Sequence, residues 1–159
     1  MFREMRRHRQ ILSIKECTDI LARGTAGVLA VLGDNDYPYT VPLSYVHDSS
    51  RIIFHMAKSG HKLDAIKDHS KVSFCVIDQD QIVEEEYTTY FRSVIVFGKA
   101  KILEDTIEKR NAFEIFAEKY SPYDELGRKA EIDKLFNQTM IVVIDIEHMS
   151  GKEAIELKK

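Results

Sequence analysis

The chain has 159 residues, of which 44% are hydrophobic and 31% are charged, a composition typical of one globular domain and not of a disordered chain. Its 23 basic residues stand against 26 acidic ones, and the resulting net charge of −3 argues against a protein that holds nucleic acid by bulk positive charge. The longest nearly continuous apolar stretch, Ala26 to Leu32, is far shorter than the about 20 residues of a membrane-spanning helix. We therefore expect a single domain over residues 1–159 with no nucleic-acid or membrane partner.

Cys17 and Cys75 lie far apart in the sequence and no CxxC occurs, which argues against a zinc ribbon or a thioredoxin-like motif. We interpret them as two buried thiols in a reducing compartment. The N-terminal stretch carries several arginines but lacks the apolar core of a secretory signal. Together these features predict a cytoplasmic protein.

A capping box opens the first predicted helix. Ser13 can accept hydrogen bonds from free backbone amides while Glu16 reaches back to the cap. Gly24 can end this helix, which we expect over residues 14–23. Three strand-like runs follow, separated by two turns rich in Asp, Asn and Ser. We expect these runs to form an antiparallel meander over residues 27–32, 39–46 and 51–57.

The middle of the chain begins with a predicted helix that Ser59 would cap, with Leu63 and Ile66 facing the core. Two more strands follow, and Gly98 would permit a bulge in the second of them. The stretch between these strands carries five acidic residues and is predicted to be a solvated loop. The two strands and the loop are expected at 72–77, 91–103 and 78–87, respectively.

Two helices and a strand complete the prediction. Asp105 would cap the first of these helices, and the second is expected around residues 126–137. The final strand is predicted over residues 140–146. The stripe expected to face the core from the first helix is Phe113, Phe116, Ala117 and Tyr120. The elements predict a mainly β fold with α, in which six antiparallel strands form a closed or split barrel decorated by helices.

Most catalytic motifs are absent. The spacings of His55, His61 and His69 do not stack two imidazoles on one helix, and no HExxH occurs, so we predict no metal site. No GxSxG, GxGxxG or GxxxxGK[ST] occurs either. The sequence therefore does not support a nucleophile-elbow hydrolase, a Rossmann dinucleotide site or a P-loop.

One stretch has the character of an anion site, because a strand ends there and a helix begins with basic residues. Gly60 would let a ligand approach the backbone, and Lys62 would add charge to the positive end of the helix dipole. Lys58, Ser59 and His61 could add donors. The alternative is a plain helix cap with solvated basic side chains, and the residues alone leave both open.

Two further positions have a functional and a structural interpretation. Pro42 cannot donate to a sheet ladder, so it belongs at an edge, at a bulge or where its neighbour is not a strand. Free backbone groups there and the hydroxyls of Thr40 and Ser44 could meet a polar ring. Arg92 and Ser93 precede an apolar run, and Arg92 could either extend to solvent or face a bound anion. An ordinary edge strand and a solvated arginine are the structural alternatives.

Three segments, in this order and spacing, resemble the pyridoxamine 5'-phosphate oxidase-related flavoproteins. They are RGTAGVLAVLGDNDYPYTVPLSYV, IIFHMAKSGHKLDAIKDHSKVSFCV and YFRSVIVFGKAKILED. The nitroimidazole-resistance branch is the most similar, since EMRRHRQ resembles its basic start and HMSGKEAIE its C-terminal end. The resemblance covers nearly the whole chain.

The resemblance implies a split β-barrel that binds FMN at the interface of a homodimer. It implies that His55 lies near the cofactor or substrate as a candidate catalytic residue, and that Arg92 and Ser93 border the cofactor pocket. The flavin phosphate would lie at Ser59, His61 and Lys62, and the flavin ring along Thr40, Val41, Pro42 and Leu43.

The expected function is that of an FMN-dependent reductase of small electron-poor substrates such as nitroimidazoles, with His55 as a proton donor. One alternative is a module that binds a flavin or another anion as a sensor or store without turnover. Another is an oxidase like pyridoxamine phosphate oxidase itself, although the distinct C-terminal segment of those oxidases has no match in this chain.

Overall fold

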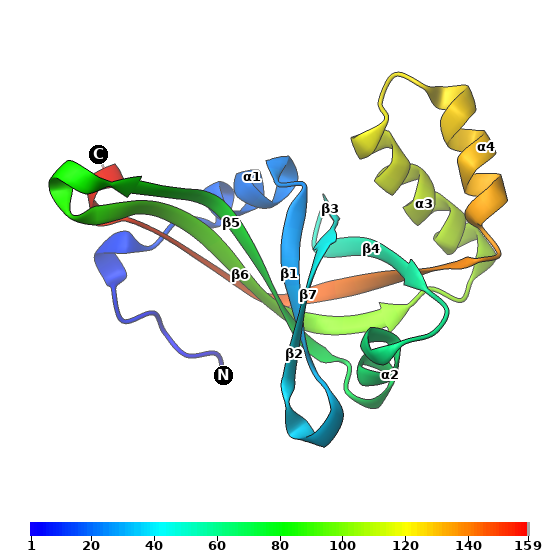
Figure 1. Cartoon of the computed structure of the whole chain (residues 1–159), viewed down its shortest axis with the longest axis horizontal. Coiled ribbons are helices and arrows are strands. Elements are labelled where there is room, and N and C mark those ends of the chain that lie inside the picture. Colours follow the sequence, from blue (N-terminus) through cyan, green and yellow to red (C-terminus); the bar gives the residue numbers. More distant parts are fainter. Residues whose placement is uncertain (159) are drawn as a thin grey trace.

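The computed structural model describes residues 1–158, which form a single antiparallel sheet of seven strands with helices around it (Figure 1). The strands are β1 (Ala26–Leu32), β2 (Pro38–Ser44), β3 (Val46–Asp48), β4 (Arg51–Ala57), β5 (Lys71–Val83), β6 (Thr88–Ile102) and β7 (Thr139–Glu153). The helices are α1 (Ile14–Arg23), α2 (His61–Asp68), α3 (Thr106–Tyr120) and α4 (Glu125–Leu135). Short 3₁₀ turns lie at His8–Gln10, Asp34–Asp36, Glu84–Glu86 and Ile155–Leu157.

The strand order β2-β1-β5-β6-β7-β4-β3 puts β2 and β3 at opposite edges of the sheet, although only Tyr45 separates them in the chain. One residue spans a few ångströms, so the sheet has to curl until its two edges approach each other. Within residues 1–158, no ladder of hydrogen bonds joins these edges, and the curled sheet therefore stays open along a seam. We use "seam" below for the gap between β2 on one side and β3 and β4 on the other.

This topology corrects two expectations and excludes one of the two expected forms of barrel. The sheet has seven strands and not six, because the predicted strand over residues 39–46 is divided at Tyr45. The meander is wrong: β2 pairs with β1, whereas β4 pairs with β3 and β7. The barrel is not closed. A period-2 pattern identifies a strand but does not reveal that its chain crosses from one sheet edge to the other.

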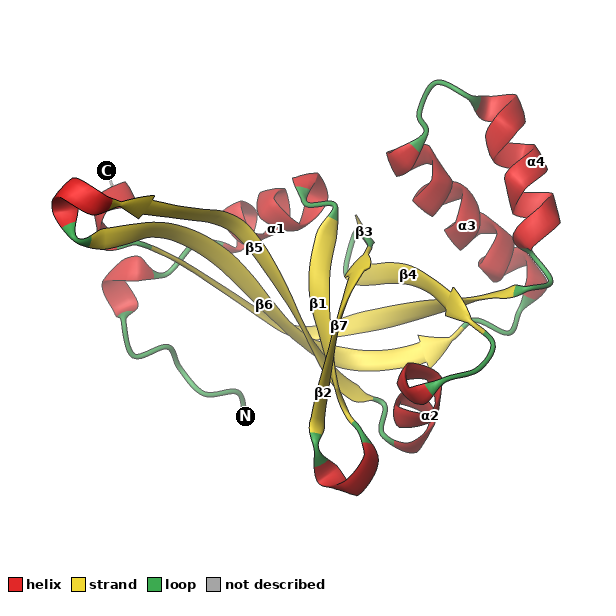
Figure 2. Ribbon diagram, in the orientation of Figure 1, coloured by secondary structure: helices red, strands yellow, loops and turns green. Residues whose placement is uncertain are grey.

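Two apolar cores lie on opposite sides of the curled sheet. The larger fills the inside of the curl and contains Leu29, Phe54, Phe74 and Val142, all fully buried. The smaller lies on the outer face of β4 and β7, where α3 and α4 cover it, with Phe113 at its centre. Figure 2 shows this pair of helices at the end of the molecule opposite the long β5–β6 hairpin.

Local predictions made from capping and bulge residues are confirmed. The Ser13 capping box is present, α1 covers residues 14–23, and the side chain of Asp105 caps α3. The register between β6 and β7 shifts between Phe97 and Gly98, as expected for a bulge. Each of these features depends on a few neighbouring residues, which explains why the sequence alone was sufficient.

Two local predictions are wrong. Gly60 and not Ser59 occupies the N-cap of α2, with a φ of 121° that favours glycine. The acidic stretch at 78–87 is mostly strand, because β5 continues to Val83 and pairs with the start of β6. Backbone pairing satisfies the amides of this hairpin, and Glu84, Glu85 and Glu86 at its tip are exposed, whereas Asp78 pairs with Arg23 and Arg92.

The cysteine prediction holds in part, because Cys17 is buried while Cys75 is only half-buried, and both are free thiols. Burial raises the pKa of Cys17 to about 11, which makes it an unreactive thiol. None of the helices in residues 1–158 is long and apolar enough to cross a membrane.

Candidate functional site

The predicted ring-binding residues lie on β2, which forms one edge of the sheet and has a single neighbouring strand. Pro42 pairs with Val28 of β1 and cannot donate a hydrogen bond on either side, and its edge position is one of the three that the sequence left open. Thr40 and Pro42 are exposed on the outer face, whereas Val41 and Leu43 point inward against the larger core. One edge of the β2 backbone thus faces the seam without a strand partner.

The predicted phosphate-binding residues lie where β4 leads into α2. Gly60 adopts a positive φ, and an added Cβ there would find no atom within 4 Å, so the backbone is open to approach. No side chain caps α2, and its first amides are therefore available to an anion together with the positive end of the helix dipole. Ser59 is exposed beside this turn.

His61 joins these two regions. Its imidazole stacks on the ring of Tyr39 at the start of β2, with 4.3 Å between the ring centroids. Its Nε2 accepts a hydrogen bond of 3.2 Å from the backbone N–H of Asp34, so the proton of the neutral ring lies on Nδ1. The start of α2 is thereby held against the start of β2. His61 is thus a link between elements, whereas Lys62 is a half-buried cation at this turn.

Lys62 has no carboxylate within ion-pair distance among the described residues. Its ammonium lies 5.7 Å from the centroid of the Phe54 ring, and burial lowers its pKa. A half-buried cation without a counter-charge is costly, and a bound anion would remove that cost. The electrostatics of this turn therefore favour a phosphate.

His55 lies on β4 two residues before the strand ends. Its neighbours Phe54 and Met56 point into the larger core, so the alternation of the strand turns His55 to the outer face. There its ring meets the edge of Phe116 on α3, at 4.9 Å between centroids and an interplanar angle of 79°. Partial burial, and secondarily the charge of Lys62, lower the pKa of His55 and so favour its neutral form.

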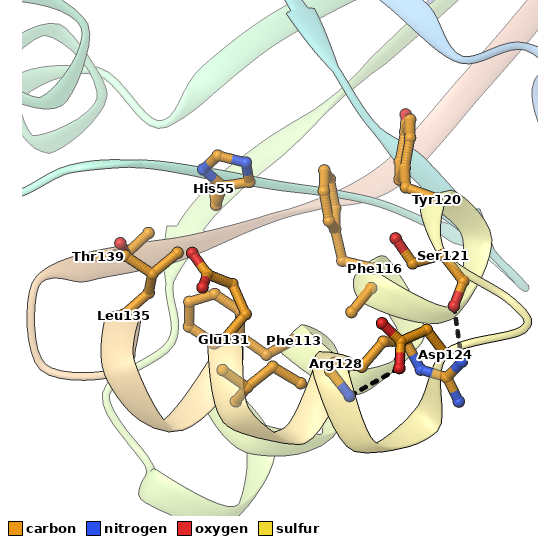
Figure 3. Close-up of a pocket in the computed structure, with 13 residues that line it drawn as sticks. His55, Phe113, Phe116, Tyr120, Ser121, Asp124, Arg128, Glu131, Leu135 and Thr139 are labelled. Atoms are coloured by element: carbon orange, nitrogen blue, oxygen red, sulfur yellow. Dashed lines mark hydrogen bonds between the residues drawn. The ribbon is translucent and has the colours of Figure 1, made fainter.

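His55 lies at the mouth of a cleft of about 360 Å³ between α3, α4 and the sheet, which Figure 3 shows with its lining side chains. The predicted core stripe of α3 contributes Phe113, Phe116 and Tyr120 to this cleft. The expected core packing is confirmed for Phe113, Phe116 and Ala117. Sequence reasoning missed that the same stripe also lines a cleft, because a helical period of apolar residues looks the same in both cases.

Tyr120 fixes α3 at the seam. Its hydroxyl oxygen accepts the backbone N–H of Tyr45 at 3.0 Å and lies 2.7 and 2.6 Å from the carbonyl oxygens of Tyr45 and Thr25. Tyr45 is the residue at which the chain crosses between the sheet edges. The cleft and the seam are therefore rigidly connected, with His55 between them.

Arg92 does not lie in this region. Its guanidinium pairs with Glu153 at 2.8 Å and with Asp78 at 3.5 Å. Its partner in β5, Gln79, lies about eight residues beyond the start of that strand, roughly 25 Å from the end of α2. Figure 1 shows this β5–β6 hairpin projecting away from α2. Within one protomer, Arg92 is bound to carboxylates and is not free for an anion.

Ser93 lies on the outer face of the sheet, where it pairs with Ile77 and Lys152. Pro42 shares that face, because cross-strand partners point to the same side. Successive cross-strand partners lead from Pro42 across the sheet, through Val28, Cys75, Ile95 and Ser150. Ser93 lies two residues before Ile95 in β6 and therefore points to the same side. The structure thus groups eight of the ten predicted residues around the seam and leaves Arg92 and Ser93 on the distant part of the sheet.

Comparisons with known proteins agree on a family and a fold. The family model described as pyridoxamine 5'-phosphate oxidase matches residues 13–153. A comparison with curated protein sequences finds no match.

Several solved structures share the fold. A conserved hypothetical protein of Mycobacterium tuberculosis is 20% identical with a TM-score of 0.80, covering 94% of this chain and 90% of that one. A proposed 5-nitroimidazole antibiotic resistance protein of Bacteroides thetaiotaomicron is 19% identical with a TM-score of 0.75, covering 90% and 86%. An FAD-binding protein of Mesorhizobium loti is 25% identical with a TM-score of 0.63, covering 91% and 97%. With most of its length matched by the family model, the chain belongs to the pyridoxamine 5'-phosphate oxidase family.

Proposed function

We propose that the protein is a flavin-dependent reductase that binds FMN along the seam. The observation that carries this proposal is the contact between His61 and Tyr39, which brings an uncapped helix start with an unpaired lysine beside the free edge of β2. An anion site next to a row of unpaired backbone groups suits a phosphate attached to a polar, flat ring system.

Each part of the seam would have one task. Lys62, Ser59 and the first amides of α2 would hold the phosphate, and the β2 backbone from Thr40 to Leu43 would meet the polar edge of the ring. One helix start with Lys62 beside it suits a single terminal phosphate, which supports FMN as the cofactor. A bound flavin would supply hydride transfer, taking two electrons from a reductant such as NADPH and passing them to the substrate.

The proposed substrates are small electron-poor compounds such as nitroimidazoles. A structural neighbour is described as a 5-nitroimidazole resistance protein, and His55 faces the cleft beside the seam, where it would supply a proton. A second candidate, a flavin-binding module without turnover, is favoured by the lowered pKa of His55, because an uncharged imidazole is a poor acid at neutral pH.

A homodimer is part of the proposal. The outer face of β5, β6 and β7 is only partly covered by the N-terminal segment, whose Phe2 packs on Phe97 and His148, and it still exposes 63% of Ile77 and 38% each of Ile95 and Phe97. Exposed apolar side chains on one sheet face are typical of protein interfaces. A second copy on this face could bring its own Arg92 and Ser93 towards the flavin, which would give these two residues the task that the family resemblance implies.

The test is the visible spectrum of the purified full-length protein, followed by titration with FMN, FAD and riboflavin. At about −0.3 kcal/mol for each of about 31 heavy atoms, FMN should bind with a sub-micromolar Kd. Riboflavin, which lacks the phosphate, should bind at least tenfold more weakly. A colourless protein that takes up none of the three flavins would contradict the proposal.

Turnover separates the two candidate functions. We expect bound flavin, reduced anaerobically with NADPH, to be reoxidised by a nitroimidazole faster than by buffer alone. Reoxidation at the buffer rate would favour the binding module. Sedimentation at micromolar concentration tests the homodimer, and a monomer in the presence of FMN would contradict it.

A further inference from the structure

The cleft between α3, α4 and the sheet has the size and lining of a small-molecule site. Its volume of about 360 Å³ lies in the usual range for such sites, roughly 300–1,000 Å³. Apolar and aromatic side chains form most of its walls. Those that the argument uses are Phe113, Phe116, Ala117, Ile132 and Leu135.

The charged side chains at the rim already have partners. Asp124 accepts the backbone N–H of Gly127 at 2.9 Å, and Arg128 donates to the carbonyl oxygens of Ser121 and Pro122 at 2.7 and 3.0 Å. Glu131 pairs with Lys134 at 3.3 Å. The rim thus carries charges of both signs, and a ligand charge of either sign would lose hydration among apolar walls and meet like as well as opposite charge, so the lining favours a neutral ligand.

His55 is the polar ring among the groups that a ligand could use, beside the hydroxyls of Ser121 and Thr139. No hydrogen bond to its ring occurs within the described part of the chain, and the ring lies over the mouth of the cleft (Figure 3). A neutral imidazole offers one donor and one acceptor. An amide, carbonyl, nitro or azole group on the ligand could therefore be bound at this end.

The aromatic wall favours a flat ligand. Phe116 stacks on Tyr120 with 4.9 Å between centroids and 23° between planes, and its edge meets His55. The hydrogen bonds of Tyr120 to the backbone fix the orientation of this wall. A rigid aromatic surface binds planar rings by stacking and excludes bulkier saturated rings.

We propose that this cleft binds a neutral planar ring compound, with the ring against Phe116 and a polar substituent hydrogen-bonded to His55. Its role as the substrate pocket of the reductase rests on the proposed function, whereas the binding itself does not. Phe113, Ala117 and Leu135 are then the residues that set the size of the ring accepted.

Four probes of almost equal size test the proposal on the full-length protein at pH 8. Benzamide is neutral and planar, benzoate and benzamidine carry opposite charges, and cyclohexanecarboxamide is neutral but not planar. In NMR titrations, we expect benzamide to shift the amide signals of α3 and α4 and to bind at least tenfold more tightly than either charged probe. Cyclohexanecarboxamide should bind several-fold more weakly. Equal affinity for benzoate or benzamidine and benzamide would overturn the proposal.

Variants locate the site. Ala117→Phe fills the cleft and should weaken benzamide at least tenfold, while Ala130→Phe, on the exposed side of α4, should leave its affinity unchanged. His55→Phe keeps a ring but removes the hydrogen bond and should weaken benzamide about three- to tenfold. Should Ala117→Phe fail to fold, Leu135→Phe fills the same cleft from α4. Unchanged affinity in a folded cleft-filling variant would contradict the proposal.

Flavin titration keeps this inference separate from the proposed function. A protein that binds FMN but no benzamide would overturn the cleft proposal alone. A protein that binds benzamide at α3 and α4 but takes up no flavin would overturn the reductase proposal and leave the binding cleft established.

Discussion

The seam and the β5–β6 hairpin each carry a basic residue that sequence reasoning assigned to an anion. The two residues differ in whether a carboxylate of the protein already pairs with them. Lys62 at the seam has no acidic partner among the described residues, whereas Arg92 on the hairpin lies between Glu153 and Asp78. Arg23 bonds the same Asp78, so four charges connect α1, β5, β6 and β7. The surrounding carboxylates, and not the basic residue itself, decide between a ligand site and a structural bond.

The largest effect should come from breaking the ion pairs of the hairpin. Arg92→Ala leaves the 4% exposed Glu153 with Lys158 as its remaining partner, at 3.4 Å. We expect the free energy of unfolding to fall by about 2–3 kcal/mol, less than for a fully isolated buried charge because Lys158 stays. Urea denaturation measures this. In a double variant with Glu153→Gln, part of the loss should be recovered.

The same variant distinguishes a structural from a ligand-binding Arg92. If the hairpin serves stability alone, FMN affinity should be unchanged in Arg92→Ala. Weaker FMN binding at unchanged stability would mean that Arg92 reaches a flavin, for example one bound across a dimer.

The second effect concerns the seam. Lys62→Ala should weaken FMN binding by about 1–3 kcal/mol, through loss of a charge-assisted bond to the phosphate, and leave riboflavin binding unchanged. Lys67→Ala, at the exposed end of α2, is the matched control and should bind FMN normally. Fluorescence titration gives both constants. Parallel losses for FMN and riboflavin would show that Lys62 acts on the fold and not on a phosphate.

The third effect tests how the seam is held. Tyr120→Phe removes the hydroxyl that bonds the backbone at Tyr45 and Thr25, and should lower the free energy of unfolding by about 1–2 kcal/mol. Tyr123→Phe, at a fully exposed position, should have no effect. Thermal and urea unfolding measure both. Equal stability of the two variants would mean that α3 is held at the seam by packing alone.

The smallest effect is a pH dependence of stability. Burial lowers the pKa of both His47 and His55, so the unfolded chain binds protons more readily than the folded one near and below the ordinary histidine value of about 6.5. Stability should therefore be complete above pH 7 and decrease as the pH falls through 6. Melting temperatures between pH 5.5 and 8 measure this slope. Replacing both histidines by Asn should flatten it, and an unaltered slope would assign it to other groups.

The predictions that were confirmed depend on residues close together in the sequence, and those that were wrong depend on residues far apart in it. The capping box joins Ser13 to Glu16 and the α3 cap joins Asp105 to Glu108, each three residues apart. Arg92 and Glu153 are separated by 61 residues, and Tyr45 and Tyr120 by 75. No pattern of nearby residues contains the information that such pairs will meet.

For His55, nearby residues predicted one part of its role and residues distant in the sequence decided the other. The strand pattern and the family resemblance singled it out, but its neighbours Phe116 and Lys62 come from other elements. The direction of its pKa shift and its place at a cleft follow from those neighbours.

The sequence by itself determined the ends of α1, the start of α3, the restriction on Pro42, the irregularity at Gly98 and the family, because caps, bulges and proline act through adjacent backbone groups. Only the tertiary structure decided that the chain crosses the open seam at Tyr45 and that Arg92 is held by carboxylates. It also decided that the stripe of α3 faces a cleft. These features depend on where a curled sheet brings distant residues together, and no local preference specifies that curl.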